Sequence, residues 1–184
     1  VCNDICNEEA VSFEHALKAL TALHTLSICA ISFRDEQTER CIARALLHCT
    51  RLMSLAVGLK QPVGISGNFL ASVVVRKGGL RALCMCNMSY HNMDFSRLKL
   101  LETLELDELR FGSANWTFAY NAAEALPCLH TLRVRGHADV AQHSFTILTS
   151  LRELSITGKA GPNPASHFAD LLAVFVGRLT NLHV

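Results

Sequence analysis

Cysteine and histidine side chains are the residues of this 184-residue sequence whose spacing comes nearest to a metal-binding or reactive site. Cys2 is followed by Cys6, and Cys84 and Cys86 are followed by His91. Thiolates and imidazoles bind zinc, but a structural zinc site draws four ligands from closely spaced pairs, and neither cluster supplies them. We therefore expect no metal and no cofactor. A two-thiol metal or redox site at Cys84 and Cys86 stays open as an alternative, because a strand would place both thiols on one face.

Motifs that would indicate catalysis are missing from the sequence. The stretch "VGISGNF" has two glycines but lacks the Lys-Ser or Lys-Thr that completes a phosphate-binding loop. Neither His-Glu-x-x-His nor Gly-x-Ser-x-Gly occurs, and no cysteine–histidine spacing indicates an activated nucleophile. We expect a protein that is not an enzyme, unless a catalytic domain is attached or the two thiols act.

Composition narrows the class of partner. Half of the residues are hydrophobic, 18% are charged, and the formal net charge is +1. Such a chain can bury a core, and it lacks the basic face of a nucleic-acid binder, so no nucleic acid contact is predicted. The apolar run Leu171–Val176 is too short to cross a bilayer, and no membrane association is predicted.

The eight cysteines do not follow the spacing of a small secreted disulfide framework. Cys29, Cys49 and Cys128 lie in or beside leucine-rich segments, where a free thiol behaves as a small hydrophobe. This favours reduced thiols and an intracellular, cytoplasmic location. N-glycosylation sequons at Asn87 and Asn115 keep a secreted alternative open.

The two similar hexamers "LHTLSI" and "LHTLRV" indicate the repeated structural element that would position the side chains named above. The pattern Leu-x-x-Leu-x-apolar occurs seven times, with first leucines separated by 29, 28, 21, 28, 22 and 28 residues. Spacings in two tight classes indicate a structural repeat. The seven hexamers begin at Leu23, Leu52, Leu80, Leu101, Leu129, Leu151 and Leu179.

This pattern resembles the leucine-rich repeat family, and the longer units are most similar to its ribonuclease-inhibitor type. The Cys49-Thr50-Arg51-Leu52 join also resembles the cysteine-containing repeats of F-box proteins. The resemblance implies an α/β leucine-rich repeat solenoid, a curved horseshoe segment with parallel strands on the concave face and helices and loops on the convex face. The family usually has Asn or Cys eight residues after the first leucine of each unit. This sequence departs from that pattern, with Ile31, Lys60 and Met88 among the residues at this position. We expect an irregular solenoid without the polar ladder.

Residues 1–22 are predicted to form an N-terminal capping helix region, and residues 23–184 seven repeats. The final repeat is truncated after its strand, so we expect either a longer parent protein or another molecule that covers this end. The short units opening at Leu80 and Leu129 should return through loops or a single helical turn. Helical spacing predicts helices over Asn7–Ala22, Asp35–Cys49, Asn68–Lys77, Ser113–Ala125 and Asn163–Gly177.

Alternation along each strand places the residues that flank the second leucine on the open, concave face. There we expect Glu105 to face Arg133, and Asp107 to face Arg135, as cross-strand ion pairs that could also contact a partner's polar groups. The predicted partner-binding residues are Thr25, Ser27, Ser54, Ala56, Cys84, Cys86, Glu105, Asp107, Arg133, Arg135, Glu153, Ser155 and His183.

The resemblance implies a non-catalytic protein–protein interaction or scaffolding module within a larger complex. A protein partner would bind through the concave strand face or the uncapped C-terminal end. Two alternatives remain open at this point. One is a set of substrate-recognition repeats of an F-box-type ubiquitin ligase, and the other is a fragment of a secreted receptor ectodomain.

Overall fold

The structure is a computed structural model, which describes residues 7–31, 36–59, 72–74, 76–87, 94–108, 125–136, 150–157 and 178–183. The predicted helices over residues 113–125 and 163–177 lie outside these ranges, apart from the terminal Ala125, and the helix over residues 68–77 is described only in part. The helical residues 72–74 fall within that last prediction.

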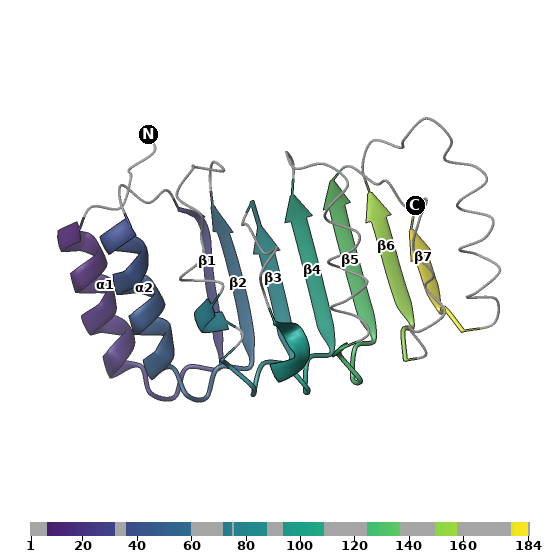
Figure 1. Cartoon of the computed structure of the whole chain (residues 1–184), viewed down its shortest axis with the longest axis horizontal. Helices are drawn as coiled ribbons and strands as arrows, with labels where there is room; N and C mark the ends of the chain where they lie inside the picture. The colour runs from purple at the N-terminus through teal and green to yellow at the C-terminus, as the bar shows by residue number, and fades with distance from the viewer. Residues whose placement is uncertain are drawn as a thin grey trace.

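A single parallel sheet of seven strands runs through the chain in sequence order and does not close into a barrel (Figure 1). Each strand begins two residues after the first leucine of a hexamer, as the two-residue alternation predicts. The parallel sheet expected from the hexamers is therefore confirmed. The strands are β1 (Thr25–Ile31), β2 (Ser54–Leu59), β3 (Ala82–Cys86), β4 (Thr103–Glu108), β5 (Thr131–Gly136), β6 (Glu153–Thr157) and β7 (Asn181–His183).

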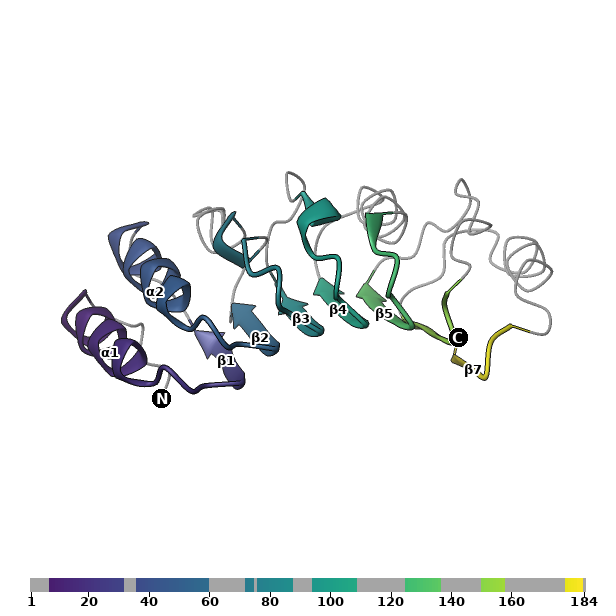
Figure 2. The ribbon, with the colours of Figure 1, turned by 90° about the horizontal axis from the view of Figure 1, so that it is seen from below.

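The helices α1 (Asn7–Ala19) and α2 (Glu36–His48) pack against each other at the N-terminal end of the stack (Figures 1 and 2). The predicted apolar stripe of α2 is confirmed, because Ile42, Ala45 and Leu46 are fully buried. Helix α1 ends three residues earlier than predicted. Its last turn is tightened by a hydrogen bond from the Leu20 amide to the Leu17 carbonyl, and the chain then continues into β1.

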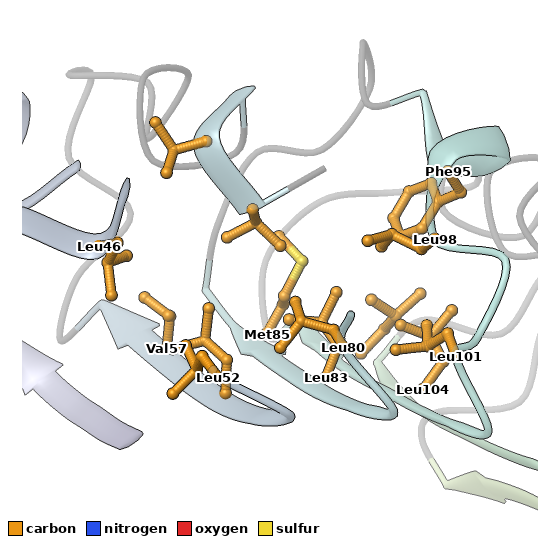
Figure 3. Close-up of a cluster of buried hydrophobic side chains, with 14 of the residues drawn as sticks. Leu46, Leu52, Val57, Leu80, Leu83, Met85, Phe95, Leu98, Leu101 and Leu104 are labelled. Atoms are coloured by element: carbon orange, nitrogen blue, oxygen red, sulfur yellow. The ribbon is translucent and has the colours of Figure 1, made fainter. Parts of the chain in front are cut away.

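The core is a column of leucines and other apolar side chains between the sheet and the layer of helices and turns (Figure 3). Leu83 on β3 lies in register with Leu55 on β2 and Leu104 on β4, and all three are almost completely buried. Phe95, on the short 3-10 helix η1 (Phe95–Arg97), closes the column on the helix side. Each unit therefore buries its leucines against its two neighbours.

One backbone motif joins each described unit to the next at the entrance to the strands. The carbonyl of His24 accepts hydrogen bonds from the amides of Met53 (2.8 Å) and Ser54 (3.0 Å). The Met53 carbonyl accepts in the same way from Arg81 and Ala82, and the motif continues to β7. Main-chain hydrogen bonds therefore connect the units at this end of the strands, and the Thr180 hydroxyl adds a side-chain bond of 3.0 Å to the Arg152 carbonyl.

At the opposite end of β3, Asn87 supplies a polar bridge that the sequence did not predict. Its backbone is left-handed, with φ of 53°, and its side-chain amide donates to the Leu59 carbonyl at 3.0 Å. Its own amide donates to the Asp107 carbonyl at 2.7 Å. One polar side chain thus bridges neighbouring units here, from the position before Met88, in a chain for which the sequence predicts no polar ladder.

The described helices and η1 all lie on one side of the sheet, and the strands follow a shallow arc whose inner side is the other face (Figure 2). No element in the described part of the chain covers that inner face, which we call the open face. At β7, Leu179 and Leu182 are only partly buried, whereas their counterparts in the interior units are almost fully buried.

Candidate functional site

The residues predicted for the open face lie in straight rows across the sheet. One row joins Ser27, Ala56, Cys84, Glu105, Arg133, Ser155 and His183 through successive strand pairs. A second row joins Thr25, Ser54, Ala82, Thr103, Thr131, Glu153 and Asn181. A third joins Gly58, Cys86, Asp107, Arg135 and Thr157. The structure thus brings every predicted partner-binding residue to one face.

Five of these residues form a charged cluster on β4, β5 and β6. Arg133 is its centre, and its shortest contacts are with Glu153, whose Oε1 accepts from Nε at 3.0 Å and from Nη2 at 2.7 Å. The hydrogen bonds from Arg133 to Glu153 are the main reason that the pKa of Arg133 is raised. The predicted partner of Arg133, Glu105, lies directly opposite in register but 3.9 Å from Nη1.

The second arginine of the cluster divides its charge between two carboxylates. Arg135 approaches Asp107, its partner in register, at 3.7 Å, and Glu105 at 3.9 Å. Both predicted cross-strand pairs are therefore present as long ion pairs. We define the charged cluster as Glu105, Asp107, Arg133, Arg135 and Glu153. Because both arginines are about half exposed, each pair contributes at most about 1 kcal/mol to stability.

One carboxylate oxygen of Asp107 is buried. Among the described residues, its Oδ1 has no hydrogen-bond donor, whereas Oδ2 faces Arg135. A buried acceptor without a donor costs about 1–3 kcal/mol relative to a satisfied one.

Cys84 and Cys86 lie next to the charged cluster, with their Sγ atoms 3.7 Å apart. The hydrogen bond between them raises the pKa of Cys84 and lowers the pKa of Cys86. Both thiols are partly buried, and their neighbours in register on β4 are Glu105 and Asp107. Among the residues that the structure describes, no group of three or more metal-ligating side chains is assembled.

The strip over β1 to β3 is made of small side chains. Ser27 lies 3.4 Å from the Cys29 thiol, and Ala56 and Gly58 continue the strip on β2. Ser54 on β2 is half-buried, and Thr25 on β1 is exposed. The open face therefore has a nearly uncharged half and a charged half, which meet at β3 and β4.

Sequence reasoning missed the strongest contact of the charged cluster. Glu153 was expected on the open face but not as the main partner of Arg133, because Thr131 is its neighbour in register. A long arginine side chain can reach the diagonal position on the next strand. The opposite charges of Arg133 and Glu153, in adjacent rows on neighbouring strands, are the only sequence signal for this contact.

No helix in the described ranges is both long enough and apolar enough to cross a bilayer. The sequence matches no protein-family model and no curated protein.

Proposed function

We propose that this chain is a leucine-rich repeat module that binds a protein partner, without catalysis, on the open face of its sheet. The recurrent hexamers and the parallel strands in chain order support the repeat assignment. The observation that carries the binding role is the alignment of the flanking residues in rows on the open face.

A stacked sheet suits binding because its surface is already ordered. The backbone at each strand entrance is held by paired hydrogen bonds to the preceding unit, so little ordering entropy is lost on association. The strands follow a shallow arc (Figure 2), so one molecule bound on its inner side could contact several strands at once. A surface of this kind suits an elongated protein segment.

The charged cluster is the proposed point of specificity. It holds three carboxylates and two guanidinium groups, so it carries one surplus negative charge. A lysine or arginine side chain of the partner would compensate the surplus negative charge, and the internal ion pairs would keep the arginines oriented for the partner's acidic groups.

The test is a matched pair of charge reversals. Arg133→Glu changes the centre of the charged cluster, whereas Arg97→Glu reverses an exposed arginine on the helix side of the sheet. Partners captured from extract of the source organism are identified with the unmodified chain, and their affinities for both variants are measured. We expect Arg133→Glu to weaken binding by roughly ten-fold or more and Arg97→Glu to leave it unchanged.

Circular dichroism and urea unfolding verify that both variants remain folded. A partner that binds both variants as tightly as the unmodified chain would contradict docking at the charged cluster. A greater loss of affinity in Arg97→Glu than in Arg133→Glu would indicate that the partner binds on the helix side of the sheet.

A further inference from the structure

A second polar site lies on the helix side of the sheet, away from the open face. A pocket of about 430 Å³ opens between α2 and the segment that contains residues 72–74. The polar side chains that line it come from both segments: Gln37, Arg40, Arg44, Ser72 and Arg76. Ala43 and Val73, both buried, add apolar lining.

The spacing along α2 explains why its polar groups converge. Gln37, Arg40 and Arg44 recur at intervals of three and four residues, which places them on one helix face. Arg76 reaches the same pocket from the next unit of the stack. Three arginine side chains thus line one pocket between two segments of the chain.

The local charges do not cancel. Arg40 is paired with Glu36 at 2.6 Å, and Arg44 lies 3.7 Å from Glu14, which is bound more closely by Lys18 at 2.9 Å. In the described part of the chain, Arg76 forms no salt bridge.

Among the described residues around the pocket, Lys18, Arg40, Arg44 and Arg76 stand against the carboxylates of Glu14, Glu36 and Glu39, which leaves one positive charge. Glu39, the other acidic residue of α2, is buried and does not line the pocket.

We propose that this pocket binds a dianionic phosphoryl group, either as free phosphate or as a phosphate monoester. Guanidinium groups match the geometry of phosphate oxygens and form the stronger, charge-assisted class of hydrogen bond. The amide of Gln37 and the hydroxyl of Ser72 are the neutral polar groups of the lining. Three arginines line the pocket, whereas a single carboxylate pairs in the bidentate manner with only one, so a phosphoryl group with three oxygens suits this lining better. The site is local, so it is compatible with a formal net charge of only +1.

Calorimetric titration of the full chain at mildly alkaline pH, where the phosphoryl group is a dianion, tests the proposal. The probes are inorganic phosphate, O-phosphoserine and serine. Arg76→Gln removes one guanidinium, and Arg152→Gln is the control at an exposed arginine that does not line the pocket. We expect dissociation constants on the order of 1 mM, weakened roughly ten-fold by Arg76→Gln and unchanged by Arg152→Gln.

Binding of O-phosphoserine but not of serine would support an esterified phosphoryl ligand, and binding of inorganic phosphate alone would identify free phosphate as the source. The proposal is overturned if neither phosphate compound binds at roughly 10 mM, or if both variants bind as tightly as the unmodified chain. Equal weakening by the two arginine variants would also overturn it, because it would indicate general charge attraction. These outcomes are independent of the open face.

Discussion

Replacing one leucine of the core column should cost more in the middle of the stack than at its edge. Leu104 on β4 is fully buried and lies in register between Leu83 and Leu132, so Leu104→Ala leaves a cavity with neighbours on both sides. Leu182 on β7 is only partly buried and has one described strand neighbour, Leu154. The position of the leucine in the stack, rather than the residue type, therefore determines how much stability the substitution is expected to remove.

The magnitudes follow from burial. Truncating a fully buried leucine removes the transfer free energy and leaves a cavity, so Leu104→Ala should destabilise the fold by about 3 kcal/mol. Leu182→Ala should cost about 1 kcal/mol, because less area is buried and the site can be refilled by solvent. Leu100→Ala, at a leucine that is 48% exposed, should change stability by less than about 0.5 kcal/mol.

Urea unfolding followed by circular dichroism measures these differences. With a slope of about 2 kcal/mol per molar urea, the midpoint should fall by about 1.5 M for Leu104→Ala and by about 0.5 M for Leu182→Ala. Equal shifts for these two variants would refute a core built by stacking, because both leucines would then have equivalent surroundings. A Leu104→Ala midpoint like that of Leu100→Ala would refute the burial itself.

Two further results are expected from the described side chains. The hydrogen bond with Lys18 holds the pKa of Glu14 in the folded protein below 4.5. The charge of Glu14 therefore stabilises the fold above pH 4.5, and this stabilisation is lost as the pH falls through the lowered pKa of the folded state. The difference in urea midpoint between the unmodified chain and Glu14→Gln should therefore shrink from pH 7 to pH 3, and a constant difference would contradict the assignment. Burial raises the pKa of the Cys49 thiol, whereas Cys29 is exposed, so a thiol-specific reagent should label Cys29 before Cys49 in the native protein. Peptide mapping by mass spectrometry determines the order in which the two thiols are labelled, and labelling of Cys49 before Cys29 would contradict the burial of Cys49.

The strands and their register could be predicted because each hexamer carries the signal several times over. The second leucine and the following apolar residue alternate with polar residues, so a shift by one position would expose every leucine. Because of this redundancy, the sequence alone predicts Glu105 opposite Arg133, and Asp107 opposite Arg135, as the structure has them.

Other features depend on information that a local pattern does not contain. The contact from Arg133 to Glu153 depends on the rotamer of a long side chain, and the bridge from Asn87 depends on one left-handed backbone angle. The arginine-lined pocket joins Arg44 to Arg76, which are separated by an entire return segment of the repeat. Lys77 likewise donates to the carbonyls of Leu47 and Cys49 at the end of α2, a contact between successive units.

The order of the strands is the claim on which the open face depends, and one distance tests it directly. Positions 27 and 155 lie in one row, separated by five strand spacings of about 4.8 Å, or about 24 Å in total. Spin labels attached to ketone-bearing residues at these two positions leave the native thiols unmodified, and pulsed electron paramagnetic resonance measures their separation. A narrow distribution near about 24 Å is predicted. A separation below about 15 Å, or a broad distribution without a maximum, would contradict strands stacked in chain order.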